Sequence, residues 1–188
     1  GWAFEGDVVA VTEQPNTRLL AFGSPCPGVE SERWSARVTA TIIPEASGAH
    51  RFTLTESGRA VLRVNGETII DASAPDIERG DSFFGFGSIE MSADIDLEAG
   101  EAVTVEIEFT NEGAILLAGV IVGSKAVVER DLVDEAVALA AECDVAVVVV
   151  GTNDDWETEG RDRDLWELPG GQPAVSYTHL RAHETDYY

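Results

Sequence analysis

The sequence has few cysteines and no long hydrophobic run. Only two of its 188 residues are cysteine, Cys26 and Cys143, and they fall in different predicted segments. Their spacing matches neither a disulfide framework nor a cysteine-based metal site. No apolar run approaches the ~20 residues of a membrane-spanning helix, and no basic and apolar leader of the signal-peptide type opens the chain. Scarce cysteine without a leader favours a cytoplasmic location.

Basic residues are also scarce. The chain has 12 Lys and Arg against 35 Asp and Glu, which gives a formal net charge of −23. Nucleic acids and anionic membrane surfaces are bound by clusters of Lys and Arg, so we expect neither as a partner. Hydrophobic residues make up 44% of the chain, which is typical of a globular protein rather than of a disordered acidic tail.

Most of the chain shows the period-2 pattern of half-buried strands. Between Trp34 and Ile42, for example, apolar residues occupy every second position. Many short strands separated by turns are typical of a β-sandwich or barrel and not of a βαβ domain. Before Arg33 the pattern is weaker: residues 8–11 could form a strand, and residues 14–28 are predicted as a loop around an apolar patch at 19–22. The predicted strands lie at residues 34–42, 51–55, 58–71, 89–97, 103–109 and 115–122.

The clearest turn lies inside residues 58–71. There Asn65-Gly66 separates two apolar runs. Both residue types tolerate the positive φ that a type I′ turn requires, so the pair predicts a tight β-hairpin.

The periodicity changes after residue 124. Asp131 can cap a helix at its N-terminus, with Asp134 three residues later. Next, residues 145–150 form an apolar run that ends at Gly151, which predicts a strand buried on both faces, as in a parallel sheet. Helix and strand together indicate the start of an α/β domain. One face of the predicted helix carries Leu132, Ala136, Leu139, Ala140 and Cys143.

Carboxylates and tryptophans follow the predicted strand. Ligands of open α/β sheets bind beyond the carboxyl ends of the strands, so this segment could form a sugar site. A solvated acidic loop is the alternative, and composition alone does not separate the two. A nucleotide-binding fragment would carry G-x-G-x-x-G or G-x-x-x-x-G-K-[ST], and neither is present. The segment contains Asp154, Asp155, Trp156, Glu157, Glu159, Arg161, Asp162, Arg163, Asp164, Trp166 and Glu167.

An ordered set of motifs in this segment resembles the glycoside hydrolase family 3 β-glucosidases. The resemblance implies the α/β-sandwich domain that follows the catalytic barrel in that family. It also implies a β-glucoside substrate, with an oligosaccharide, aryl or alkyl leaving group, and no cofactor or metal. The matching pieces are residues 147–151, Trp156-Glu157-Thr158-Glu159-Gly160, Asp162-Arg163, Leu168-Pro169-Gly170 and Gln172.

The preceding β region resembles the protective-antigen-type domain inserted in many of these enzymes. We therefore expect a mainly β chain: an antiparallel β-sandwich over residues 1–123, followed over 124–174 by the first helix and strand of a truncated α/β-sandwich domain. Residues 175–188 resemble a translated sequencing adapter and are predicted to be non-native. The resemblance is carried by Trp34-Ser35-Ala36-Arg37, residues 44–52, Ser57-Gly58-Arg59-Ala60, Val64-Asn65-Gly66 and Phe84-Gly85-Phe86-Gly87-Ser88.

The resemblance also implies roles for individual residues. Retaining glycosidases use two carboxyl groups about 5–5.5 Å apart, a nucleophile and an acid/base. The family's nucleophile is on the barrel, which this chain lacks, so we expect the fragment alone to be inactive and to need that barrel. The second Glu of the motif, Glu159, corresponds to the acid/base, with Glu157 as the rival. Trp156 is a candidate for substrate binding, and Arg163 is expected to fix the loop through an ion pair.

Three further aromatic residues are candidates for substrate binding. In the family the inserted domain overhangs the active site on the aglycone side, and sugar faces stack on aromatic rings. Phe83, Phe84 and Phe86 are therefore candidates for sugar contacts, with burial in the sandwich core as the alternative. A second hypothesis for the whole chain is a non-catalytic carbohydrate-binding module, although such a module has no need of the segment from Trp156 to Gln172.

Overall fold

The chain forms a β-sandwich followed by a smaller helical unit. The computed structural model describes residues 7–128, 131–153, 156–157, 163 and 166–173. Two compact units divide the chain, residues 1–128 and residues 129–188. All the described strands belong to the first unit and the described α-helix to the second. The mainly β prediction is thus confirmed.

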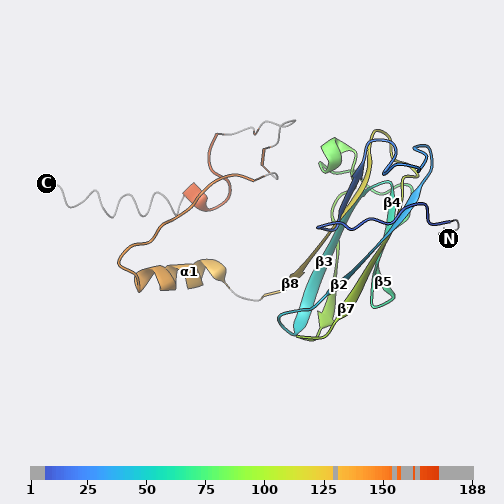
Figure 1. Cartoon of the computed structure of the whole chain (residues 1–188). Helices are drawn as coiled ribbons and strands as arrows, with labels where there is room; N and C mark the ends of the chain where they lie inside the picture. The colour runs from blue at the N-terminus through green and yellow to red at the C-terminus, as the bar shows by residue number, and fades with distance from the viewer. Residues whose placement is uncertain (1–6, 129–130, 154–155, 158–162, 164–165, 174–188) are drawn as a thin grey trace. The chain divides into compact units, whose positions relative to one another are not determined.

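Two antiparallel four-stranded sheets make up the first unit (Figure 1). The first has the order β1-β8-β3-β6 and the second the order β2-β7-β4-β5. Buried residues of both sheets form one hydrophobic cluster, as in a sandwich. The first sheet consists of β1 (Arg18–Ala21), β8 (Ala118–Ala126), β3 (Gly48–Ser57) and β6 (Met91–Leu97). The second consists of β2 (Ser35–Ile42), β7 (Val103–Thr110), β4 (Arg59–Val64) and β5 (Glu67–Ala72).

The core contains the inward residues of the four central strands. Phe109 of β7 is fully buried and lies 5.4 Å, centroid to centroid, from the ring of Trp34. The Trp34 indole N–H donates to the carbonyl oxygen of Gly23, so its one polar group is paired. Such a core forms because period-2 strands place every second side chain on the same face. Its other fully buried large residues are Phe52, Leu54, Leu62, Ile107, Leu117, Val64 and Val120.

The predicted hairpin is confirmed. Strands β4 and β5 pair across Asn65 and Gly66, whose φ angles are 50° and 82°. The Asn65 side-chain oxygen also accepts a hydrogen bond from the Thr104 backbone N–H at 2.9 Å. The turn is therefore tied to the neighbouring strand β7.

Polar residues cover the outer faces of the sheets as cross-strand ion pairs. Arg37 and Arg63 both contact the carboxylate of Glu108, at 2.8 and 2.5 Å. Arg51 makes two hydrogen bonds of 2.8 Å to Asp94 on the paired strand. Hydrogen bonding by Arg51 lowers the pKa of the Asp94 carboxyl below its ordinary value, although partial burial opposes the shift.

Two strand predictions need correction at the first sheet. Strand β1 lies inside the segment predicted as a loop, where its four residues pair with β8. Residues 8–11 form no strand and are exposed. Strand β8 starts at Ala118 rather than at residue 115, and its pairing with β3 continues to Ala126. Ile115 and Leu116 are exposed in the preceding loop, and burial of apolar side chains begins at Leu117, just before the strand. The sandwich unit accordingly extends past residue 123, the predicted end of the domain.

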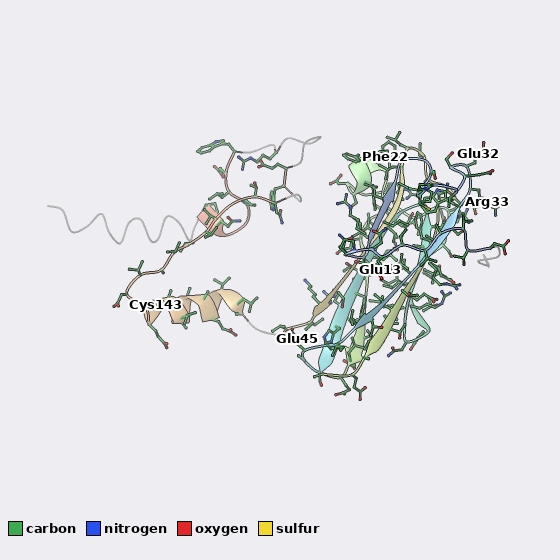
Figure 2. The ribbon with its side chains drawn as sticks, viewed as in Figure 1. Glu13, Phe22, Glu32, Arg33, Glu45 and Cys143 are labelled. Atoms are coloured by element: carbon green, nitrogen blue, oxygen red, sulfur yellow. The ribbon has the colours of Figure 1, made fainter. Side chains whose placement is uncertain are left out.

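Several loops gather at one end of the sandwich. The pairings Ser57 with Gly119 and Ser35 with Thr110 place the ends of β3 and β7 beside the starts of β8 and β2. The short 3-10 helix η1 (Phe83–Gly85) lies at this end (Figure 1). Phe22 lies at the same end, and Glu45 at the opposite end (Figure 2). The connection between β5 and β6, which carries the candidate aromatic residues, therefore belongs to a cluster of loops.

In the second unit the predicted helix is present and the predicted strand is absent. Helix α1 (Leu132–Ala141) begins after Asp131, whose carboxylate accepts from the backbone N–H groups of Val133 and Asp134 at 3.0 Å. Residues 145–150 have no regular secondary structure. A strand needs a hydrogen-bonded neighbour, and the described residues of this unit contain no other strand. No described helix is long and apolar enough to span a membrane.

Candidate functional site

The aromatic loop, residues 80–88, separates the three candidate phenylalanines. Phe83 is buried, with 8% of its surface exposed, whereas Phe84 is 73% exposed and Phe86 is half-buried. The ring of Phe83 fits against two glycines, because a Cβ at Gly87 or at Gly119 would lie 2.7 Å from its ring carbons. Phe83 is therefore buried in the sandwich, which was the alternative to a sugar contact. Phe84 presents the exposed ring.

The backbone of the aromatic loop is strained. Phe83 and Phe84 have φ angles of 54° and 60°, in the left-handed region that bulky residues avoid. Gly85 continues in the same region with φ of 85°. Each non-glycine residue held there costs about 1–3 kcal/mol and persists only where its surroundings enforce it. Strain of this kind is concentrated at functional sites, so the loop is the leading candidate site of the sandwich.

Backbone hydrogen bonds enforce the strained conformation. The N–H groups of Gly85 and Gly87 both donate to the carbonyl oxygen of Ser82, at 3.1 and 2.9 Å. At the base of the loop, Gly80 N–H donates to Gly87 O at 2.9 Å, which closes the loop on itself. The loop is then joined to β3 by Ser88 N–H, which donates to the Glu56 carbonyl oxygen at 2.7 Å.

A buried carboxylate lies beneath this loop. Glu56 is fully buried at an inward position of β3, two residues after Leu54. Its Oε1 atom faces Arg79 Nη1 at 3.3 Å, and the same nitrogen lies 3.4 Å from the carbonyl oxygen of Phe86. The Glu56 backbone N–H donates to Ser88 Oγ at 3.1 Å. Glu56 thus contacts both sides of the loop base.

Burial dominates the electrostatics of Glu56. Desolvation raises the pKa of its carboxyl above the ordinary value, although Arg79, the Gly58 backbone and Arg59 oppose the rise. The second carboxylate oxygen, Oε2, is buried with no hydrogen-bond partner in the described part of the chain. The sequence patterns predicted no role for Glu56 or Arg79. The sequence did contain a sign of the burial of Glu56: it continues the period-2 series of Phe52 and Leu54, whose side chains are apolar.

In the second unit, the side chain of Gln172 is paired with the backbone of Gly151. The Gln172 side-chain amide accepts from Gly151 N–H at 2.9 Å and donates to Gly151 O at 3.0 Å. The two bonds therefore hold Gln172 beside Gly151, 21 residues earlier in the sequence. Between these two residues in the sequence, Trp156 is about half exposed, with its backbone N–H donating to Asn153 O at 2.9 Å.

Both carboxylate oxygens of Glu157 have a partner. Its Oε1 accepts from the Thr152 hydroxyl at 2.8 Å, and its Oε2 pairs with Arg163 Nε at 3.0 Å. Arg163 therefore fixes the loop through an ion pair, as expected. Glu159 lies outside the residues that the structure describes. Its position in the sequence falls between the two members of the Glu157–Arg163 pair.

A cavity of about 490 Å³ lies beside these groups. Its size is in the range of small-molecule sites, and the half-exposed Trp156 forms part of its wall. Among the described residues, no three His, Cys, Asp or Glu side chains gather as metal ligands would. The cavity is lined by Val149, Val150, Gly151, Thr152, Asn153, Trp156, Pro169 and Gln172.

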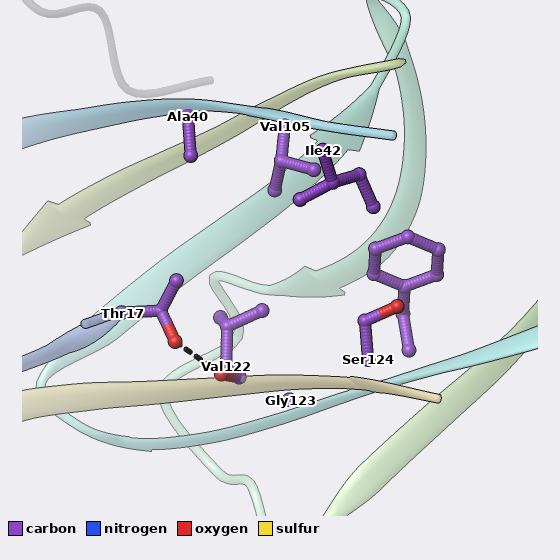
Figure 3. Close-up of a pocket in the computed structure, with 8 residues that line it drawn as sticks. Thr17, Ala40, Ile42, Val105, Val122, Gly123 and Ser124 are labelled. Carbon is purple, nitrogen blue, oxygen red and sulfur yellow. Dashed lines mark hydrogen bonds between the residues drawn. The ribbon is translucent and has the colours of Figure 1, made fainter. Parts of the chain in front are cut away.

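A second cavity, between the two sheets of the sandwich, is too small for a sugar. Its volume is about 70 Å³, far below the few hundred that a small-molecule site needs. Thr17 donates a hydrogen bond to the Val122 carbonyl oxygen beside it, while Ala40, Ile42 and Val105 form its apolar wall (Figure 3). This cavity is a packing gap in the core.

Comparison with protein families identifies the sandwich unit. The family model described as PA14 domain matches residues 3–127. The match covers every strand of the first unit and ends where that unit ends.

Similar whole proteins are named β-glucosidases. The β-glucosidase of Rhizobium radiobacter is 32% identical over 176 residues, which is 92% of this chain and 21% of the relative. A probable β-glucosidase H of Aspergillus fumigatus is 31% identical over 182 residues, 91% of this chain and 22% of the relative. The crystal structure of the Kluyveromyces marxianus β-glucosidase in complex with glucose matches with a TM-score of 0.78 and 28% identity over 93% of this chain. The chain spans about a fifth of the length of these relatives.

Proposed function

The chain belongs to the PA14 domain family, and because it also resembles β-glucosidases along most of its length, we propose that it is part of a retaining β-glucosidase. The observation that carries this proposal is the extent of the similarity. It covers 92% of the chain and so continues from the sandwich into the second unit. A free-standing sugar-binding module would have no need of the segment from Trp156 to Gln172.

The proposed reaction is hydrolysis of a terminal β-D-glucosyl residue. In this proposal Glu159 is the acid/base, and it protonates the departing oxygen before it deprotonates the attacking water. The nucleophile lies outside residues 1–188, so this chain alone should not hydrolyse glycosides. Glu157 is the less suitable acid, since both of its carboxylate oxygens already have partners in Thr152 and Arg163.

A glycosidase assay tests the proposal directly. The full-length protein that contains this chain should hydrolyse p-nitrophenyl β-D-glucoside, and proton NMR should show β-glucose as the first product. The α-glucoside, which presents the opposite anomeric configuration, is the matched control. A full-length protein that binds cellobiose but hydrolyses no glycoside would favour the carbohydrate-binding module instead.

We further propose that Phe84 contacts the aglycone part of the substrate. Its ring is 73% exposed on a strained loop, an arrangement that holds an apolar surface in water. Aromatic rings of this kind stack on the faces of sugars and aryl groups, a contact worth about 0.5–1.5 kcal/mol beyond area burial. Phe86 is half-buried and contributes less surface.

Removing the ring should weaken substrate binding without unfolding the domain. In the full-length protein, we expect Phe84→Ala to raise KM for cellobiose about 2- to 10-fold with little change in kcat, which is the loss of one stacking contact. Phe22→Ala is the matched control, because Phe22 is also exposed, at 64%, and lies outside the loop. An unchanged KM for Phe84→Ala, measured at equal thermal stability, would exclude the proposed aglycone contact.

A further inference from the structure

The cluster of Glu56, Arg79 and Ser88 has no role in the reaction proposed so far. It lies beneath the aromatic loop of the sandwich unit. The ion pair is not needed for stability alone, because an apolar side chain at such a buried position is generally as favourable or better. What a buried ion pair can supply instead is one defined geometry, since its partners tolerate few arrangements in a desolvated site.

The contacts of the cluster match that task. Arg79 directly precedes the loop, and its Nη1 atom reaches both the Glu56 carboxylate and the Phe86 carbonyl oxygen. At the C-terminal end of the loop, Ser88 forms two bonds to the backbone of Glu56, through its N–H and its Oγ. The two sides of the loop are therefore fixed to the same buried residue.

The loop between these points has a conformation that it would not adopt by itself. Phe83 and Phe84 are both left-handed, and relaxation of the backbone would turn the Phe84 ring away from its present direction. Burial of the Phe83 ring against Gly87 and Gly119 holds one residue of the pair. The Phe84 ring, in contrast, is 73% exposed. Its direction depends on the loop base.

We propose that Glu56 is a positioning residue whose side chain, through Arg79, holds the aromatic loop in its strained form and so sets the affinity of the aglycone side for substrate. The proposal rests on the proposed function, because it assumes that Phe84 contacts the substrate. Glu56 itself is fully buried, so in this proposal it acts on the substrate only through the loop.

The test compares Glu56→Gln with Glu112→Gln in the full-length protein. The first change keeps volume but removes the charge that Arg79 pairs with. The second removes the carboxylate of an exposed pair with Arg59, at 3.0 Å, on the same domain. Three quantities are measured. The first is the rate of chymotrypsin cleavage after Phe84, identified by mass spectrometry. The others are KM for cellobiose and the inhibition constant of gluconolactone, which has no aglycone.

For Glu56→Gln we expect cleavage after Phe84 to be about 10-fold faster, because a protease needs the loop to open. KM for cellobiose should rise about 3- to 10-fold, with kcat and the gluconolactone constant unchanged. Glu112→Gln should resemble the wild type in every measurement. If Glu56→Gln yields no folded protein, Arg79→Gln replaces it, since Arg79 is the partly exposed member of the pair, with 38% of its side chain exposed.

The outcomes separate this inference from the proposed function. Unchanged cleavage, or faster cleavage with an unchanged KM while Phe84→Ala raises it, overturns the positioning role of Glu56. A Phe84→Ala variant with normal KM overturns the aglycone contact itself, and the inference is lost with it. Hydrolysis that fails in the wild type removes the enzyme proposal, while the cleavage result still reports whether Glu56 holds the loop.

Discussion

Replacing Glu159 by Gln in the full-length protein is expected to lower kcat/KM for cellobiose by about 10²–10⁴-fold. That is the usual contribution of one positioned general acid/base. The glucose that departs from cellobiose is a poor leaving group and must be protonated as the bond breaks, so the loss of the acidic proton slows cleavage of the glycosidic bond. The change keeps the size of the side chain and so leaves the two bonds between Gly151 and Gln172 in place.

Leaving-group dependence makes this prediction specific. With 2,4-dinitrophenyl β-glucoside, whose phenolate leaves without protonation, the first step should be nearly normal and only the later hydrolysis slow. Added azide should then restore turnover and give β-glucosyl azide, because azide attacks without a general base. Full activity on cellobiose, or slow turnover of the dinitrophenyl glucoside that azide does not relieve, would contradict the assignment.

Glu157→Gln is the matched control two residues away. Glu157 pairs with Arg163 at 3.0 Å, and Glu159 lies between these two residues in the sequence. Loss of the pair should loosen the base of that short span and reduce the rate on every leaving group alike. Azide should have no effect on this variant. A pattern of azide rescue in Glu157→Gln rather than in Glu159→Gln would exchange the two roles.

The strands that the sequence predicted well are those whose pattern is set by the sandwich. In β2 and β7 one face meets the core and the other meets water, so the alternation of apolar and polar residues reports the structure directly. The hairpin at Asn65-Gly66 was predictable for a different reason, because the turn chemistry is local.

The failures have a common physical origin in pairing. The four residues of β1 form a strand only because they pair with β8, which lies about 100 residues later in the sequence. Residues 145–150 have strand-forming side chains but no partner strand among the described residues of their unit. Strand formation is a property of two segments, and the pattern of one segment does not contain the other.

The candidate site shows the same limit at the level of side chains. The sequence Phe83-Phe84-Gly85-Phe86 does not tell which ring is buried, because the loop leaves the strand period. Two left-handed residues in succession decide it, and they depend on contacts with Ser82, Gly87 and Gly119. The burial of Glu56 was not predicted either. The sequence did contain one sign of it, because Glu56 follows Phe52 and Leu54 at the period-2 spacing of the inward face of β3.

The largest expected effect on stability is that of Phe109→Ala. Phe109 is fully buried, and its ring contacts Trp34 and fills the space left by the missing side chain of Gly58. Deleting a buried phenylalanine ring costs about 3–5 kcal/mol, as lost transfer free energy plus the cavity that remains. We expect the free energy of unfolding to fall by that amount, measured by urea denaturation followed by tryptophan fluorescence. Phe84→Ala is the matched exposed control and should change it by less than about 0.5 kcal/mol.

A double-mutant cycle with Gly58 tests the reason for the loss. A Cβ at Gly58, where φ is 145°, would lie 2.8 Å from the Phe109 ring and closer still to the Thr110 carbonyl oxygen. Gly58→Ala should therefore destabilise the wild type strongly and the Phe109→Ala variant less, with a coupling of about 0.5–3 kcal/mol. The clash with Thr110 belongs to the backbone and remains in both backgrounds, so part of the cost should persist. Strict additivity of the two changes would mean that the ring and the glycine do not share this space.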